Sequence, residues 1–239
     1  VSFTRWKGLS LNITFSGLNN YIKLFNDSKF WNALTHNLTA LVVLPPIIIG
    51  LSLLFAALFV QGVKGSRFFR ISFFFPQVMS VVIIGVLWSF IYHPTIGILN
   101  GVIELLGIES LTNFPWLGDT RTLFPAILGV VVWSSVGFYM VLFVSGMSGI
   151  PNDYYEAARI DGAGSVTLFF RITLPLLWET IRTSIIFVGI GAMDLFAIVT
   201  VMTNGLGGGP SRSADVIPTL LSQSAFQDSE WGYATAMGV

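Results

Sequence analysis

The sequence contains no cysteine and only two histidines, His36 and His93. Without cysteine the chain has no disulfide framework and no thiol nucleophile, and two histidines leave few ways to build a zinc site. Charge is scarce as well, because only 10% of the residues are charged and the 12 basic residues balance the 12 acidic ones. A chain with no net charge carries no electrostatic footprint for nucleic acid. We therefore expect no nucleic-acid partner.

Apolar residues are abundant, at 54% of the chain, and the mean hydropathy is +0.77. Four uncharged or nearly uncharged runs are long enough to cross a hydrocarbon core of about 30 Å. They predict spans at 38–60, 71–92, 123–147 and 183–203. We expect an all-α, polytopic bundle in contact with membrane lipid, formed by one domain over residues 1–239.

The two ends of the sequence bear on how many spans it holds. The chain begins at Val1 without a starter Met or a targeting segment, and an apolar run opens at Ala234 just before the last residue. We expect a fragment that lacks sequence at both ends, with four complete spans and a fifth that is cut off.

A polar segment, residues 148–176, separates the third apolar run from the fourth. Pro151 suits the first turn of a helix, where its missing N–H costs nothing. Asp153 and Glu156 place negative charge near the positive end of the helix dipole. The pattern predicts a short helix that starts here.

The rest of this segment suits a docking surface. Ala157 and Ala158 favour helix and have almost no side chain, so a partner surface can approach the backbone closely. Gly162 permits the backbone conformation that ends a helix. Pro175 restricts Leu174, which should fix the angle at which the chain re-enters the bilayer. An ordinary amphipathic connector is the alternative.

The spacing of this segment is Glu-Ala-Ala, three residues, Gly162, nine residues, then Ile-x-Leu-Pro. That pattern resembles the cytoplasmic loop of permease subunits in binding-protein-dependent ABC importers, especially the carbohydrate-uptake (maltose/glycerol-phosphate-like) branch. The resemblance covers nearly the whole chain. It includes residues 17–37, residues 68–80, the stretch PTIGILNGVIELLG, and MTNG with GGGP.

The resemblance implies a type I importer permease fold and a subunit that does no covalent chemistry and needs no cofactor. It also implies three partners: a cytoplasmic ABC ATPase dimer, a second homologous permease and an external solute-binding protein. The setting would be a bacterial or archaeal plasma membrane. The residues that it assigns to ATPase coupling are Glu156, Ala157, Ala158, Arg159, Asp161, Gly162, Leu174 and Pro175. The chain shows no nucleotide-binding motif, so we expect ATP hydrolysis in a separate chain.

Basic residues in the short loops predict the orientation. Two loops carry three each, and these are Lys64, Arg67 and Arg70 in 61–70, and Arg159, Arg171 and Arg182 in 148–182. The other two loops carry one each, Arg121 and Arg212. Positive charge accumulates on the cytoplasmic side, so residues 148–176 should face the cytoplasm. Four basic residues within 1–33 run against this assignment, but the rule is weaker for longer segments.

Asp194 is the only ionisable residue deep inside a predicted span. A carboxylate there costs roughly 3 kcal/mol or more unless it faces water or a partner. We expect it on the solute path, accepting hydrogen bonds from sugar hydroxyls or pairing with an amino group. The resemblance also implies a solute site shortly before 202–205. The alternatives are a protonated carboxyl, or a charge paired with another subunit for assembly.

The third predicted span combines aromatic and hydroxyl side chains that could stack on a sugar ring and hydrogen-bond its edge. These candidate solute contacts are Trp133, Ser134, Ser135 and Tyr139. Small residues at this density also suit helix packing in a membrane, and the sequence alone favours packing.

We predict the permease subunit of an ATP-driven importer for a sugar or related solute. The main alternative is a self-contained ion-coupled carrier or channel, in which Asp194 binds a cation or proton and residues 148–176 have no role. A membrane-embedded enzyme would need two or more catalytic groups at similar depth, and only Asp194 is available.

Overall fold

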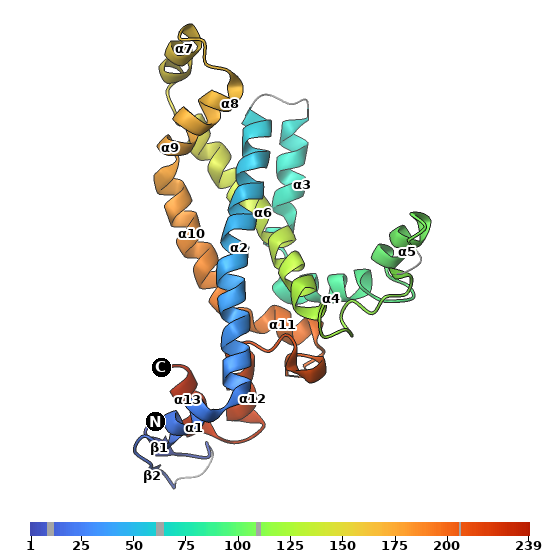
Figure 1. Ribbon diagram of the computed structural model, residues 1–239, viewed down its shortest axis with the longest axis vertical. Coiled ribbons are helices and arrows are strands. Elements are labelled where there is room, and N and C mark those ends of the chain that lie inside the picture. Colours follow the sequence, from blue (N-terminus) through green and yellow to red (C-terminus); the bar gives the residue numbers. More distant parts are fainter. Residues whose placement is uncertain (9–11, 61–64, 109–110, 206) are drawn as a thin grey trace. The chain divides into compact units, whose positions relative to one another are not determined.

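The computed structural model describes residues 1–8, 12–60, 65–108, 111–205 and 207–239. The chain is predominantly helical, as predicted (Figure 1). It divides into two compact units. The first unit comprises Val1–Ala40, Val81–Val130 and Ala192–Val239, and the second comprises Leu41–Ser80 and Val131–Gly191. Lys64, one of the basic residues that predict the orientation, lies outside the described residues.

Two helices are each long and apolar enough to cross a membrane by themselves. They are α2, Ser28–Val60, and α6, Leu123–Ser148. The apolar run at 123–147 therefore forms a helix almost as predicted. The helix that contains 38–60 begins ten residues earlier, at Ser28, because its first turns are polar and hydropathy does not detect them.

The run at 71–92 does not form one continuous helix but two, α3, Ser66–Val78, and α4, Val81–Ile91. Met79 is extended, with φ −77° and ψ 148°, and ends α3. Pro76 weakens the last turn of α3, because proline removes a backbone donor and its ring crowds the preceding turn. By length and composition the pair could still form one broken span.

The run at 183–203 is also divided. Helix α10, Trp178–Met193, begins five residues before the predicted start, and α11, Phe196–Met202, follows after a break at Asp194 and Leu195. Asp194 thus lies between two helices and not inside one. The break follows Gly189 and Gly191, which have low helix propensity.

The segment that precedes α10 consists of short elements. They are α7, Asn152–Ile160, α8, Ser165–Leu168, the π-helical turn η2, Phe169–Thr173, and α9, Leu174–Leu176. The axis of Ser165–Leu176 makes an angle of 69° with that of α10. The four predicted membrane spans are compatible with the two unbroken helices together with two bent helix pairs, if each pair forms one span. The number of spans stays a prediction.

Close helix packing builds the second unit. The Ser52 hydroxyl on α2 donates to the Val136 carbonyl on α6 at 3.0 Å. A Cβ at Gly137 would lie 1.8 Å from the Phe73 carbonyl oxygen, so only glycine lets α6 approach the backbone of α3 this closely. The rings of Phe55 and Phe73 lie 4.9 Å apart between their centroids. At Gly137, the small residue therefore serves close packing of α6 against α3.

The first unit has two packed regions. In one, α4 contacts α11 at Gly85, where a Cβ would come within 2.8 Å of the Val201 side chain. In the other, a small apolar core joins helix α1 and the start of α2 to α12 and α13, and strand β1 contacts α13. The remaining bounds are β1 Thr4–Arg5, β2 Thr14–Phe15, α1 Asn19–Asn26, α5 Ile98–Leu105, η3 Pro210–Arg212, α12 Ile217–Phe226 and α13 Trp231–Met237. Ala234 lies within α13, and the fifth span expected from it stays a prediction.

Candidate functional site

Helix α7 forms the exposed part of the expected docking segment. Pro151 is extended, with φ −58° and ψ 137°, and immediately precedes the helix. Asp153 lies in the first turn and Arg159 in the last, so both charges interact favourably with the helix dipole and stabilise the helix. None of the nine residues of α7 is buried. The helix therefore offers nearly its whole surface for contact.

The end of α7 is a Schellman motif. Gly162 has φ +83°, its N–H donates to the Arg159 carbonyl at 3.0 Å, and the Ala163 N–H donates to the Ala158 carbonyl at 2.9 Å. The predicted helix end at Gly162 is confirmed. A Cβ at this glycine would meet no atom within 4 Å, so the left-handed backbone alone demands glycine.

The expectation that Pro175 keeps Leu174 out of helical conformation is wrong. Leu174 is helical, with φ −62° and ψ −45°, and its N–H donates to the Phe169 carbonyl, five residues back. The wider π-helical turn leaves room for the pyrrolidine ring that would crowd an ordinary α-turn. The bend instead comes at Leu177, between α9 and α10.

A side-chain contact ties α7 to this turn. The Thr173 hydroxyl is buried and donates to the Leu168 carbonyl at 3.4 Å, so its oxygen can accept from the Tyr155 hydroxyl at 3.0 Å. The sequence analysis missed Tyr155, because its partner lies 18 residues away and no local pattern reveals the contact.

A pocket of about 620 Å³ lies between α7 and the neighbouring helix ends. Glu156 and Arg159 both line it, together with Tyr155, so the structure brings these two predicted coupling residues to one cavity. Its other walls come from α2, α6 and residues 165–173. Ala157, Asp161, Gly162 and Pro175 are exposed, whereas Ala158 and Leu174 are half-buried.

The predicted solute contacts belong to different units. Asp194 is exposed and belongs to the first unit, whereas the four candidates on α6 belong to the second. Trp133 is 41% exposed, Ser135 is half-buried, and Tyr139 is buried. The Ser134 hydroxyl donates to the Val131 carbonyl of its own helix at 3.1 Å. Trp133 is therefore the most accessible of the four.

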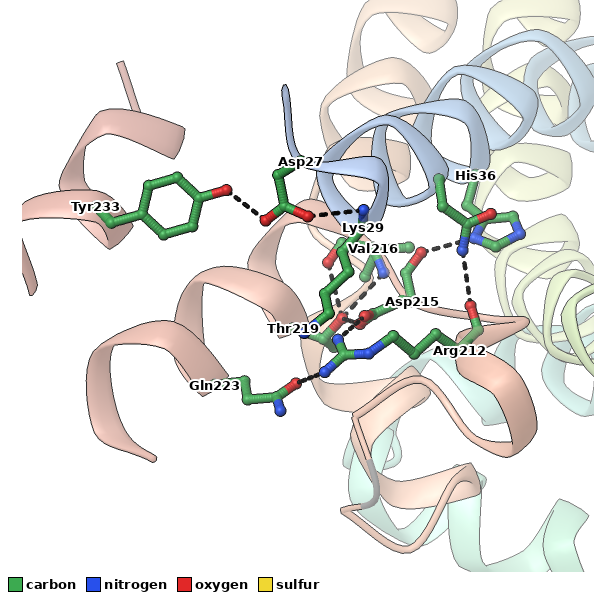
Figure 2. A network of polar contacts seen from close by, with 10 residues as sticks. Asp27, Lys29, His36, Arg212, Asp215, Val216, Thr219, Gln223 and Tyr233 are labelled. Carbon is green, nitrogen blue, oxygen red and sulfur yellow. Dashed lines mark hydrogen bonds and ion pairs between the residues drawn. The ribbon is translucent and has the colours of Figure 1, made fainter. Parts of the chain in front are cut away.

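The first unit contains a polar network around Asp215, which the sequence analysis did not predict (Figure 2). The Asp215 side chain is 1% exposed, and its carboxylate pairs with the Arg212 guanidinium at 2.7 Å. Arg212 also donates to Gln223 at 2.8 Å, and the Thr219 hydroxyl donates to the Asp215 carboxylate. The His36 ring contacts the Asp215 carbonyl oxygen at 2.7 Å.

A second polar contact joins α13 to the start of α2. The Tyr233 hydroxyl donates to the Asp27 carboxylate at 2.6 Å (Figure 2). Burial and the Asp27 carboxylate together raise the pKa of Tyr233 well above its usual range. Lys23 pairs with Glu230 and lies 4.4 Å from the centre of the Tyr233 ring. Within the described ranges, no three His, Asp or Glu side chains gather as metal ligands would.

Comparison with known proteins identifies the family. Residues 30–238 match the family described as the inner membrane component of binding-protein-dependent transport systems. The chain belongs to this family. It is a permease subunit of an ABC importer, located in the membrane, and the predicted resemblance is confirmed.

Individual relatives agree with this assignment. The chain is 39% identical to the diacetylchitobiose uptake system permease protein NgcF of Streptomyces coelicolor, over 99% of this chain and 69% of the relative. It is 33% identical to the multiple sugar-binding transport system permease protein MsmF of Streptococcus mutans, over 100% of this chain and 80% of the relative.

A solved structure shows the same fold. It is a bacterial ABC transporter involved in the import of the acidic polysaccharide alginate, with a TM-score of 0.78 and 24% identity. The match covers 93% of this chain and 77% of that chain. The predicted importer-permease fold is confirmed.

Proposed function

We propose that this permease carries a saccharide or related solute and that α7 docks on a cytoplasmic ABC ATPase dimer formed by separate chains. The observation that carries the proposal is α7 itself, a short helix with no buried residue and a glycine-defined end. A helix without a fully buried residue gains little from packing within its own chain, so most of its surface is available to a partner. The sugar assignment is supported by the names of the relatives.

The contacts of α7 suggest how ATPase movement would reach the solute path. Tyr155 holds α7 to Thr173 in the π-helical turn, and the chain then bends at Leu177 into α10. The far end of α10 is Met193, next to Asp194. Displacement of α7 would therefore act directly on the helix that ends at the candidate solute residue.

We infer that Asp194 and Trp133 contact the solute. An exposed carboxylate between two helices can accept hydrogen bonds from two neighbouring sugar hydroxyls, and an exposed indole can stack on a sugar ring. Ser135 and Tyr139 could add hydroxyl contacts, whereas Ser134 already donates within its own helix. Rocking of the spans would expose this path to each side of the membrane in turn.

The remaining partners follow from the same proposal. A second homologous permease would complete the pathway, and an external solute-binding protein would deliver the solute, as one solved alginate transporter was crystallised with a bound periplasmic protein. We place residues 148–176 on the cytoplasmic side, in accordance with the basic residues of the short loops.

Cysteine cross-linking tests the docking assignment, because these 239 residues contain no cysteine. A cysteine at Ala158 and one in the cleft of the ATPase should form a disulfide whose yield changes when ATP binds. Labelling of the same cysteine in intact cells by a membrane-impermeant maleimide would overturn both the orientation and the docking role. Uptake that persists without the ATPase would favour an ion-coupled carrier.

A further inference from the structure

Asn37 is a buried amide on α2 that bonds to two distant parts of the first unit. It is 1% exposed. Its Nδ2 donates to the Ala192 carbonyl at 3.1 Å and, more weakly, to the Met193 carbonyl at 3.5 Å. Its Oδ1 accepts a hydrogen bond from the Ile217 N–H at 2.8 Å. These partners fix the orientation of the amide, because a flipped side chain would set its NH₂ against an N–H and its oxygen against a carbonyl.

Both partners are backbone groups at helix ends. Ala192 and Met193 are the last residues of α10, directly before the break at Asp194. Ile217 is the first residue of α12, and the preceding Val216 has no side-chain oxygen to cap it. Asn37 therefore caps the C-terminus of one helix and the N-terminus of another. Breaking either bond would leave a buried backbone group without a partner, which is costly.

The α12 side of this link is held firmly. The Val216 N–H donates to the Thr219 hydroxyl at 2.9 Å, and that hydroxyl donates to the buried Asp215 carboxylate. Arg212 pairs with the Asp215 carboxylate, and next to this pair the Ala214 N–H donates to the Gly208 carbonyl at 2.8 Å. Bonds within the segment thus connect residues 208–219 to one another, and the segment bonds to Asn37 through the Ile217 N–H.

We propose that Asn37 is a positioning residue that links this segment to the helix break at Asp194. A shift of the first turn of α12 would move the Ile217 N–H, and Asn37 would have to release either that group or the Ala192 carbonyl. Either release would change the backbone beside Asp194. The inference rests on the proposed function in one respect, namely that Asp194 lies on the solute path.

The test compares two substitutions of Asn37 in the assembled transporter, reconstituted with its ATPase and solute-binding protein. Asn37→Leu removes both bonds at similar volume. Asn37→Asp keeps the acceptor for Ile217 but sets an oxygen against the Ala192 carbonyl. The control is Ser52→Ala on the same helix, which removes a buried hydroxyl that donates to the Val136 carbonyl at 3.0 Å and does not touch the break.

The main readout is the ratio of ATPase activity with and without the solute-loaded binding protein. Both Asn37 variants should lower this ratio about tenfold, in the range of ordinary coupling energies between sites. Ser52→Ala should leave it unchanged even if it lowers thermal stability. An unchanged ratio in Asn37→Leu would overturn the proposal, and so would an equal loss in Ser52→Ala.

A second readout does not depend on Asp194 binding solute. A cysteine at Met193, which is 39% exposed, is labelled with maleimide with and without the loaded binding protein. The labelling rate should differ between the two conditions, and Asn37→Leu should abolish the difference. If Asn37→Leu abolishes the labelling difference while Asp194→Asn binds solute with normal affinity, the solute role of Asp194 is rejected, and the role of Asn37 as a link between α12 and the helix break is retained. No difference in the native background, or failure of both Asn37 variants to assemble, would overturn the link.

Discussion

At the scale of single residues, Arg212 and Asp215 form an ion pair whose carboxylate is almost completely shielded from water. Removing the cation would leave a buried charge without compensation, which generally costs about 3–5 kcal/mol. We expect Arg212→Met to lower the unfolding temperature strongly. The double variant Arg212→Met with Asp215→Leu should recover part of the loss, because it also removes the stranded charge.

This effect is measured by heating the purified permease and monitoring the loss of folded protein by size-exclusion chromatography. Arg171→Met provides the control, because Arg171 is exposed. If Arg212→Met unfolds at the same temperature as the control, the ion pair between Arg212 and Asp215 does not stabilise the folded permease.

Tyr233 links stability to alkaline pH. Its ordinary pKa is 10.0 and the folded value is higher, so the unfolded chain loses the phenol proton first as the pH rises. The stability from this contact is therefore complete below about pH 10 and is lost above it. Tyr233→Phe should cost about 1–3 kcal/mol near pH 8, because it removes a hydrogen bond to a carboxylate.

Unfolding temperatures measured between pH 8 and pH 11 test both parts of this prediction. The native protein should lose stability above pH 10 more steeply than Tyr233→Phe. Tyr154, which is 55% exposed, provides the matched control as Tyr154→Phe. Parallel curves for all three proteins would contradict the prediction.

At the scale of elements, the end of α7 depends on the left-handed backbone of Gly162. A residue with a side chain pays about 1–2 kcal/mol for that conformation. We expect Gly162→Asp to shift the end of α7 and to reduce uptake about tenfold relative to ATP hydrolysis, while membrane insertion stays intact. Uptake measured together with ATPase activity in proteoliposomes gives this ratio.

Gly164→Asp is the control for charge. Gly164 has φ −79° and ψ 168°, a conformation open to any residue, and a Cβ there would also meet no atom within 4 Å. Gly164→Asp should therefore preserve the ratio of uptake to ATP hydrolysis. Normal uptake in Gly162→Asp would contradict the coupling role of this helix end.

The contact between α7 and the π-helical turn makes a separate prediction. Tyr155→Phe removes one hydroxyl from a half-buried pair, a net change of about 1 kcal/mol, and should lower ATP-driven uptake about fivefold. Thr173 keeps its bond to the Leu168 carbonyl, so the turn itself should persist. Transport assays of Tyr155→Phe beside Tyr154→Phe measure the effect, and equal uptake in the two would exclude a role for the contact.

At the scale of the whole molecule, hydropathy predicted α2 and α6 because each is one apolar helix. It did not predict the interruptions at Met79 and Asp194, because apolar residues continue on both sides and a change in φ and ψ leaves no trace in hydropathy. Pro151, Asp153 and Glu156 predicted the start of α7, and Gly162 predicted its end, since both depend on local backbone preferences and on the helix dipole.

Long-range polar contacts were beyond the sequence analysis for a different reason. Asp215 lies in a polar stretch of the sequence, yet its side chain is buried. Asn37 bonds to Ile217 across 180 residues, and neither residue is unusual in its local sequence. Such contacts are specified by the packing of the unit and not by any window along the chain.

The π-helical turn at Phe169–Thr173 contains one residue more than an α-helical turn would need. An extra residue of this kind can be absorbed or displaced along a helix at the cost of few hydrogen bonds. Each residue advances a helix by about 100° around its axis. Deleting one residue from the turn would therefore shorten the connection only slightly but would rotate the attachment point of α7 strongly about the helix axis. The docking surface of α7 would then face in another direction.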